Sequence, residues 1–326
     1  MPDILIIKPS SFGDIIHGLQ VATSIRSQLP EARISWVVAE RFTGLVERCE
    51  AVDHVFVFHR RGGWREFYAL LRGLRSTKFD VVIDMQGLAR SGVMTLATRA
   101  RRKMGRSDAR EGARVFYTEC TPLPGIAHSA HAVDVLLQFL PMLGLKGELC
   151  GDVAFRDSPV PHGVSTGEDS PLILFPSSRR AEKNWQGFSD LTDRLLEAYP
   201  SRQVVWAGDA PAEGNNRRPA GRFLNLTGKT GLGEVIGLVG NALLVVANDS
   251  GPAHLAAACG VPVVVLFGPT DPRRFGPYPP DRSSNRVLSA PGGDLQRLTV
   301  DAVLSMVTDC IGTENNPDHG MRGTYD

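Results

Sequence analysis

Short apolar runs alternate with longer amphipathic stretches along the first hundred residues. The runs have the length of buried strands and cover residues 4–8, 34–38, 55–58 and 81–85. The stretches between them repeat apolar residues at helical spacing and predict helices at 14–29, near 42–49, at 64–74 and from 88 to about 98. Fully apolar strands that alternate with helices predict a parallel sheet covered on both faces.

The same alternation starts again after residues 156–170, a segment rich in Pro, Gly, Ser and charge that predicts a linker. Strands are expected at 172–175, 203–206, 223–226, 243–247 and 263–267. Helices are expected near 187–198, 232–239, 252–259 and 300–310. We therefore predict an α/β chain of two Rossmann-like doubly wound domains, residues 1–160 and 161–311, and a polar tail at 312–326.

The loops richest in chemistry follow the carboxyl ends of predicted strands, after residues 8, 85, 175, 206, 247 and 267. Ligands of doubly wound sheets bind beyond these ends, and two such domains on one linker are expected to form a cleft. The convergence of these loops is stronger evidence for a ligand site than any single motif.

The sequence from Asn248 to His254 joins a predicted strand to a predicted helix, and Pro252 is suited to the first turn of that helix. Such a helix start presents free backbone N–H groups and the positive end of a dipole, which favours a phosphate or diphosphate. A second Gly/Pro turn, residues 268–272, follows the next strand, and its small residues let the backbone approach a ligand closely. Both turns predict a site for the diphosphate of a nucleotide sugar.

The sequence from Pro9 to Asp14 follows the first predicted strand and opens the first helix. Ser10 or Ser11 is suited to cap that helix, and Asp14 falls in its first turn, where a carboxylate complements the helix dipole. The functional alternative is that Asp14 takes a proton from an acceptor hydroxyl. His17, one helical turn further on, faces either the same site or the core.

Two loops of the second half carry groups suited to a nucleotide sugar. Residues 176–185 combine hydroxyls, cations and an aromatic ring, and Lys183 would neutralise a departing diphosphate. The alternative is a solvated loop in which Trp185 packs on the next helix. Residues 207–213 form a Gly-containing turn where a carboxylate would hold ribose hydroxyls, although this pattern also fits an ordinary surface loop.

Charge is unevenly distributed, although its net value is only +1. Residues 1–156 contain 21 Lys and Arg against 16 Asp and Glu, a net +5, and the remainder contains 15 against 19, a net −4. The first half includes two basic clusters, residues 59–65 and 99–103, which would bind phosphates or carboxylates of an acidic acceptor. Arginines that are merely solvated on loops explain the same pattern.

Other site types lack support in the sequence. Gly228-Lys229-Thr230 is not part of a P-loop, because Phe223 stands where that motif needs glycine, and no GxGxxG follows the first strand. The five cysteines include no CxxC pair, and no His, Asp or Glu cluster has metal-binding spacing, so no metal or other cofactor is expected. No signal peptide and no apolar run of membrane-spanning length is recognisable, which predicts a cytoplasmic protein.

These motifs together resemble the bacterial lipopolysaccharide heptosyltransferases of glycosyltransferase family 9, and the heptosyltransferase I type above all. Four blocks in the family's order carry the resemblance: residues 4–14 (ILIIKPSSFGD), 82–88 (VIDMQGL), 183–185 (KNW) and 248–272. The resemblance implies the GT-B fold, in which two Rossmann-like domains face a cleft. It implies an inverting, metal-independent transfer of L-glycero-D-manno-heptose from ADP-heptose to a hydroxyl of a lipopolysaccharide inner-core (Kdo-lipid A type) acceptor.

The resemblance also implies roles for residues. Asp14 matches the family's proposed catalytic base, and Lys183 matches the lysine that contacts the donor diphosphate. The implied donor-binding residues are Ser178, Glu213, Asp249, Ser250, Gly251, Pro252, Ala253 and His254. The implied acceptor-binding residues are Ser10, Ser11, Gly13, His17, Arg60, Arg61 and Gln86. The chain departs from the family at Ser250, where Thr is common, and at Thr230, where relatives place a larger apolar residue against adenine.

The implied partners are the nucleotide-sugar donor, an acidic lipid-linked saccharide acceptor and, peripherally, the cytoplasmic face of the inner membrane, with no nucleic acid. Three alternatives stay open. One is a GT-B enzyme such as a nucleotide-sugar 2-epimerase, which needs no acceptor, and another is a transferase that uses a different nucleotide sugar on another surface glycan. The third is a two-domain binding protein without catalysis, although such proteins are usually exported.

Overall fold

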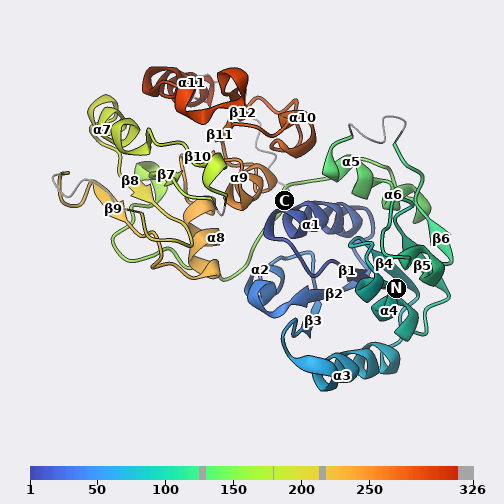
Figure 1. Ribbon diagram of the computed structural model, residues 1–326. Helices are drawn as coiled ribbons and strands as arrows, with labels where there is room; N and C mark the ends of the chain where they lie inside the picture. The colour runs from blue at the N-terminus through green and yellow to red at the C-terminus, as the bar shows by residue number, and fades with distance from the viewer. Residues whose placement is uncertain (125–129, 179, 213–217, 315–326) are drawn as a thin grey trace. The chain divides into compact units, whose positions relative to one another are not determined.

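The computed structural model describes residues 1–124, 130–178, 180–212 and 218–314 (Figure 1). The chain divides into two compact units, Met1–Ser158 and Pro159–Asp326. Each unit contains one six-stranded sheet with helices packed against it. The division falls inside the polar segment that the sequence predicts as a linker.

Unit 1 contains the strands β1 (Asp3–Ile7), β2 (Arg33–Ala39), β3 (His54–Phe58), β4 (Val81–Asp84), β5 (Arg102–Gly105) and β6 (Glu119–Cys120). Its α-helices are α1 (Phe12–Gln28), α2 (Thr43–Val46), α3 (Gly63–Ser76), α4 (Ala89–Ala97), α5 (Ala132–Leu137) and α6 (Phe139–Met142). The sheet order is β3-β2-β1-β4-β5-β6, and every neighbouring pair is parallel.

Unit 2 contains the strands β7 (Leu172–Phe175), β8 (Val204–Trp206), β9 (Phe223–Asn225), β10 (Leu244–Asn248), β11 (Val263–Phe267) and β12 (Asn285–Ser289). Its α-helices are α7 (Phe188–Ala198), α8 (Leu232–Gly240), α9 (Gly251–Ala258), α10 (Pro272–Phe275) and α11 (Val300–Glu314). The sheet order is β12-β11-β10-β7-β8-β9, again parallel throughout.

Both units share one topology, in which the first strand pairs with the second on one side and with the fourth on the other. The strand order therefore reverses between β1 and β4 in unit 1 and between β7 and β10 in unit 2. At such a switch point the connecting loops leave in opposite directions, which opens a crevice beyond the carboxyl ends of the strands. The predicted fold class of two Rossmann-like doubly wound domains is confirmed.

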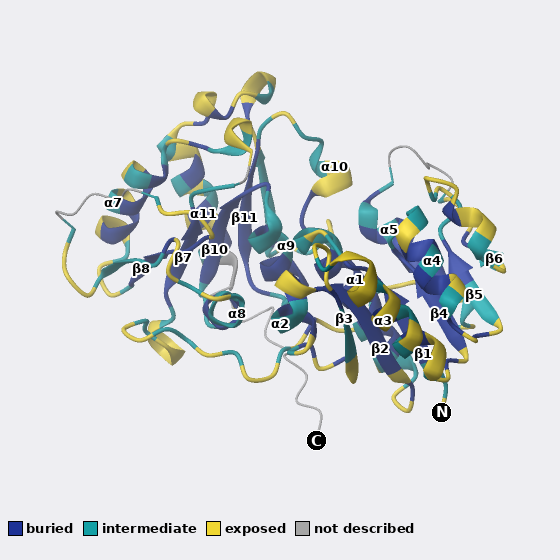
Figure 2. Ribbon diagram, turned by 60° about the horizontal axis from the view of Figure 1, so that its bottom comes forward, coloured by how far each residue is buried: buried dark blue, intermediate teal, exposed yellow. Residues whose placement is uncertain are grey.

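The central strands form the cores because both of their faces are covered. Every residue of β4, β7, β10 and β11 is buried, as the dark blue strands of Figure 2 show. Such strands are apolar at successive rather than alternate positions, and only the last residues of β4 and β10, Asp84 and Asn248, are polar. This pattern explains why the sequence predicts β7 and β11 with the correct bounds.

The remaining differences concern short or polar elements. The sequence predicts no strand at β5, β6 or β12 and no helix at α5, α6 or α10, because these elements are short or carry polar residues at the sheet edge. The basic cluster 99–103 overlaps β5 and is therefore not only a loop. Helix α11 continues through Glu314, so the first residues of the predicted tail are helical, and residues 315–326 lie outside the described residues.

Candidate active site

At the switch point of unit 1, the loop after β1 places Lys8 against Asp14. Lys8 is buried, at 3% exposure, and its Nζ lies 3.7 Å from Asp14 Oδ1. The backbone N–H and Oγ–H of Ser11 donate to Asp14 Oδ2 over 3.0 and 2.6 Å, which caps helix α1. Both carboxylate oxygens are therefore oriented by neighbours, while the side chain as a whole stays 46% exposed.

These contacts keep Asp14 ionised. Burial alone would raise the pKa of this carboxyl, but the Lys8 ammonium and the hydrogen bonds from Ser11 outweigh it and hold the pKa at about 2. Burial in turn lowers the pKa of Lys8, although the nearby carboxylate opposes that shift. Asp14 is thus in the form that accepts a proton at any physiological pH.

The loop after β4 lies beside that after β1 and is organised by Asp84. Its Oδ1 accepts from the backbone N–H groups of Gln86 and Gly87 over 2.9 and 3.0 Å, and its Oδ2 accepts from the Tyr117 hydroxyl over 2.8 Å. Asp84 is fully buried, and this burial raises the pKa of its carboxyl. Lys8 connects the two loops, because its Nζ donates to the carbonyl of Met85 over 3.3 Å.

The predicted acceptor residues of this region differ in exposure. Ser11 is exposed, and Ser10, Gly13 and Gln86 are half-buried. His17 is only 5% exposed, and its ring lies edge-on to that of His131 at 5.6 Å, so the side chain belongs to the interior of unit 1. The charge of this side chain is nevertheless among the causes that lower the pKa of Asp14, so the role of His17 at the acceptor site stays a prediction.

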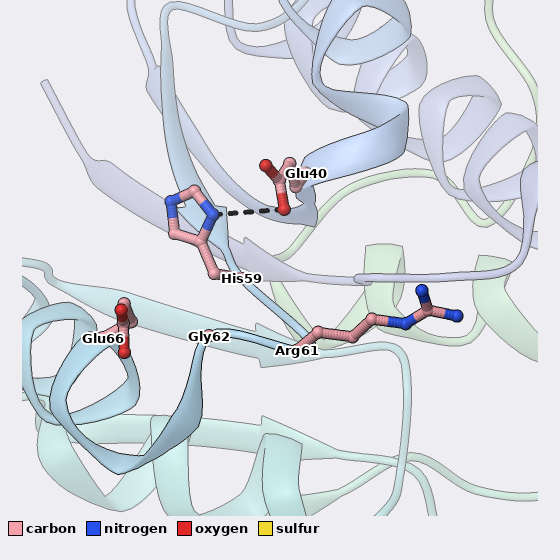
Figure 3. Close-up of a pocket in the computed structure, with 5 residues that line it drawn as sticks. All are labelled: Glu40, His59, Arg61, Gly62 and Glu66. Atoms are coloured by element: carbon pink, nitrogen blue, oxygen red, sulfur yellow. Dashed lines mark ion pairs between the residues drawn. The ribbon is translucent and has the colours of Figure 1, made fainter.

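Arg60 and Arg61 lie at the same edge of the sheet, in the exposed connection from β3 to α3. An open hollow here is lined by Glu40, His59, Arg61, Gly62 and Glu66. His59 Nδ1 lies 3.2 Å from Glu40 Oε2, and Figure 3 shows the Arg61 side chain extending away from this pair. Its guanidinium is therefore not held by the two carboxylates that line the hollow.

At the switch point of unit 2, Lys183 pairs with Asp249. The Lys183 ammonium donates to Asp249 Oδ2, and the Thr270 hydroxyl donates to the same oxygen over 2.5 Å. Lys183 is 15% exposed and Asp249 is 6% exposed. The pair connects the loop after β7 to the end of β10, and Thr270 adds the turn after β11.

Two asparagines hold the backbone around this pair. The side-chain oxygen of Asn184 accepts from the Ser178 backbone N–H over 2.6 Å, which closes the loop that carries Lys183. The fully buried Asn248 accepts from the Trp185 N–H over 3.1 Å and donates to the Pro176 carbonyl over 3.1 Å. The loop that carries Lys183 and the start of α9 are therefore held in fixed positions relative to each other.

Helix α9 begins directly after Asp249, with Ser250 as its N-cap residue and Pro252 in its first turn. Within the described part of the chain, Ser250 Oγ is buried without a hydrogen-bond partner. The Ala253 N–H donates to the Ser250 carbonyl over 3.2 Å, and the Ala253 side chain is buried. Gly251 and His254 are half-buried. This helix start has the position and the unused hydroxyl that an anion site needs.

The predicted ribose contact, Glu213, lies outside the described residues. In the same turn, Gly208 has φ +143°, and a Cβ there would come within 3.2 Å of Ser177 Oγ. Ser178, another predicted donor residue, donates through its Oγ to the Arg180 carbonyl over 2.9 Å. Its hydroxyl must rotate before it can contact a phosphate.

Sequence reasoning did not single out several residues that organise these loops. Lys8, Asp84 and Thr270 lie within motifs that it quoted, but only the folded chain shows that each contacts a candidate residue. Tyr117 carried no signal, because it follows a strand that the sequence did not predict. Among the described residues, no group of three or more His, Cys, Asp or Glu side chains is arranged to hold a metal ion.

None of the helices in the described ranges has both the length and the apolar character needed to cross a membrane.

The chain is 29% identical over 323 residues to lipopolysaccharide heptosyltransferase 1 of Escherichia coli O18:K1:H7 (strain RS218 / NMEC), a match that covers 93% of this chain and 96% of that protein. It is 30% identical over 295 residues to the protein of the same name from Salmonella typhimurium (strain LT2), covering 84% of this chain and 91% of that one.

Solved structures show the same architecture. The E. coli heptosyltransferase WaaC with ADP matches with a TM-score of 0.79 and 26% identity over 94% of this chain and 99% of that one. Its structure with ADP-2-deoxy-2-fluoro heptose matches with a TM-score of 0.76, 25% identity and the same coverage. The fold is thus that of the GT-B glycosyltransferases. The family model for glycosyltransferase family 9 (heptosyltransferase) matches residues 67–297. The family motifs lie in the two switch-point loops, and these matches identify the same family. The chain belongs to glycosyltransferase family 9.

Proposed function

We propose that this glycosyltransferase moves L-glycero-D-manno-heptose from ADP-heptose to a hydroxyl of a lipopolysaccharide inner-core acceptor of the Kdo-lipid A type, with inversion at the anomeric carbon. The observation that carries the proposal is the Lys183–Asp249 pair, which lies at the switch point of unit 2 directly before the start of α9. The names of the similar proteins, heptosyltransferase 1 and WaaC with ADP, support the choice of donor.

Unit 2 is suited to hold the donor. An ammonium has three hydrogen-bond donors, so Lys183 can bind a diphosphate oxygen while it still contacts Asp249. Lys183 and Thr270 both donate to Oδ2 of Asp249. Because neither of them binds Oδ1, that oxygen can accept hydrogen bonds from the sugar hydroxyls. The backbone at the α9 start and the Ser250 hydroxyl complete the phosphate contacts.

The same groups stabilise the leaving group. Negative charge grows on the diphosphate as the bond to the anomeric carbon breaks, and Lys183 and the N-terminus of α9 offset that charge. These groups supply the positive charge that a metal ion would otherwise bring, so we propose a transfer that needs no metal cofactor. Chelation with EDTA should then leave the rate unchanged.

Unit 1 is suited to activate the acceptor. Asp14 is held as a carboxylate and is 46% exposed, so it can take the proton of the attacking hydroxyl. The half-buried Ser10 and Gly13 and the exposed Ser11 belong to the same loop and first turn of α1 as Asp14, and the half-buried Gln86 belongs to the neighbouring loop after β4. Arg60 and Arg61 would bind the acidic groups of the saccharide at the same edge of the sheet.

We also propose that helix α3 contacts the anionic cytoplasmic face of the inner membrane, where a lipid-linked acceptor resides. Trp64 and Tyr68, four residues apart on one face of the helix, are 74% and 57% exposed. Leu70 and Leu74 point instead into unit 1. The segment 60–75 has five exposed arginines and one glutamate (Arg60, Arg61, Arg65, Arg72, Arg75 and Glu66). Exposed aromatic rings among arginines are typical of helices that lie on anionic lipid.

The decisive experiment is calorimetric titration of the purified protein with ADP, ADP-heptose, UDP and UDP-N-acetylglucosamine, followed by turnover with the preferred donor and a Kdo-lipid A acceptor. Selective binding of ADP and ADP-heptose, together with heptose transfer, is the expected result. A preference for UDP ligands would favour another transferase, or a 2-epimerase if the nucleotide sugar is converted without an acceptor. Binding without any turnover would favour a binding protein.

A further inference from the structure

The Lys8 side chain is a charged group that the proposed reaction does not use directly. Lys8 follows β1, at the centre of the sheet of unit 1, and only 3% of its side chain is exposed. Burial of an ammonium is costly, and an apolar side chain of the same length would fill the space at lower cost. The position therefore calls for an explanation other than packing.

The surroundings of Lys8 supply one. Its Nζ lies 3.7 Å from Asp14 Oδ1 and donates to the Met85 carbonyl over 3.3 Å. The Lys8 backbone is itself fixed, because its carbonyl accepts from the Trp36 indole N–H over 3.1 Å. The ammonium thus connects the helix that carries Asp14 with the loop after β4.

Asp14 has two anchors of different chemistry. Ser11 binds Oδ2 and belongs to the same turn, so it fixes the carboxylate relative to helix α1 only. Lys8 faces Oδ1 from the strand, so it fixes the carboxylate relative to the sheet. The other charged or titratable groups that act on the pair are Asp84, Arg106 and His17.

We propose that Lys8 is a positioning residue for the transfer reaction, which aims the half-buried Asp14 carboxylate and keeps it ionised. Lys8 touches neither donor nor acceptor in this role and acts through Asp14. The inference rests on the proposed function, in which Asp14 accepts the proton of the attacking hydroxyl.

The first test is the pH profile of Lys8→Met, which removes the charged end and keeps an unbranched side chain of nearly the same length. The pKa of Asp14 should rise from about 2, because burial remains and the ammonium is gone while only the contacts from Ser11 and His17 still lower it. Its kcat/KM should therefore acquire an acidic limb that wild type lacks. At pH 7 we expect kcat to fall on the order of 10-fold through lost orientation, with KM for ADP-heptose within about twofold.

The control is Lys146→Met, which removes an exposed lysine 4.0 Å from Glu148 in the same unit and should leave both kcat and the pH profile unchanged. Thermal unfolding of each variant separates misfolding from an altered site. A merely structural role of Lys8 would lower stability without creating an acidic limb. An unchanged profile, or a kcat at pH 7 that equals or exceeds that of wild type, would overturn the proposal.

A second measurement does not depend on activity. Carbon-13 NMR of aspartate-labelled protein, with the Asp14 signal assigned by its loss in Asp14→Asn, follows the titration of Asp14 directly. An upward shift of the titration midpoint in Lys8→Met supports the role of Lys8, and an unchanged midpoint contradicts it. If wild type transfers no heptose, the proposed function fails, and this titration still tests the effect of Lys8 on Asp14.

Discussion

Lys183 and Asp249 lie 66 residues apart in the chain and form an ion pair at the carboxyl edge of the second sheet. The pair joins the loop after β7 to a residue between β10 and α9. The two loops are close because β7 and β10 are neighbouring parallel strands. A cation and a carboxylate that meet directly before a helix N-terminus can bind the charged and the hydroxylated parts of a nucleotide sugar at once.

Replacing Lys183 with Ala should slow transfer on the order of 10²-fold, as expected for the loss of an electrostatic stabiliser of the leaving group. Steady-state kinetics with ADP-heptose measure this loss. Arg194→Ala is the matched control in the same unit. It removes a cation that forms an exposed ion pair with Asp301 and that has no proposed part in donor binding. Unchanged kinetics in Lys183→Ala would reject the role.

Asp14→Asn should abolish nearly all turnover, by on the order of 10²–10⁴-fold, because the amide cannot accept the acceptor proton. Affinity for ADP, measured by calorimetry, should stay the same, since the proposed donor contacts belong to unit 2. Asp80→Asn serves as the control, because Asp80 accepts from the Asp3 N–H at the opposite edge of the sheet. Near-normal turnover in Asp14→Asn would disprove the assignment of the base.

Asp84→Asn should make stability less dependent on pH. Burial raises the pKa of Asp84 in the folded protein above 3.8, so its contribution to stability is fully present below pH 3.8 and is lost as pH rises through the folded pKa. The amide does not titrate, so the variant should gain stability relative to wild type between pH 4 and pH 8. Urea unfolding at both pH values measures the difference in stability, and a difference that stays constant would contradict burial as the cause of the raised pKa.

Gly105→Ala should destabilise unit 1 by about 1–3 kcal/mol, the usual cost of overpacking. A Cβ at this position would lie 2.1 Å from the ring of Tyr117, which donates to Asp84. Gly240→Ala is the matched control, because a Cβ there has no described atom within 4 Å and the residue ends helix α8. Urea unfolding that shows no loss of stability in Gly105→Ala would mean that the Tyr117 ring moves away at little cost.

The double substitution Trp64→Ser and Tyr68→Ser should weaken binding to anionic vesicles on the order of 10-fold, since both rings are exposed on the arginine-rich face of α3. Co-sedimentation with phosphatidylglycerol-containing and with purely zwitterionic vesicles measures the effect. Val115→Ser, which changes another exposed apolar side chain of unit 1, should have no effect. Equal binding of wild type to both kinds of vesicle would disprove the contact.

The alternation of apolar runs and helical stretches was enough to determine the fold class and the central strands. This succeeded because strands buried on both faces, such as β7 and β11, must be apolar at every position. The same reasoning missed β5, β6 and β12, although it predicted the edge strands β3 and β9. β6 has only two residues and β12 is half-buried, so packing against neighbours rather than composition makes them strands.

The sequence by itself also determined which residue types end the central strands, and with them the family and the candidate residues Asp14, Lys183 and Asp249. Only the tertiary structure decided which of these groups meet. Lys183 contacts Asp249, Lys8 contacts Asp14, and the ring of His17 packs against that of His131. The physical reason is that strand order in a parallel sheet differs from order in the chain. Loops far apart in sequence become neighbours only where the order reverses between β1 and β4 and between β7 and β10.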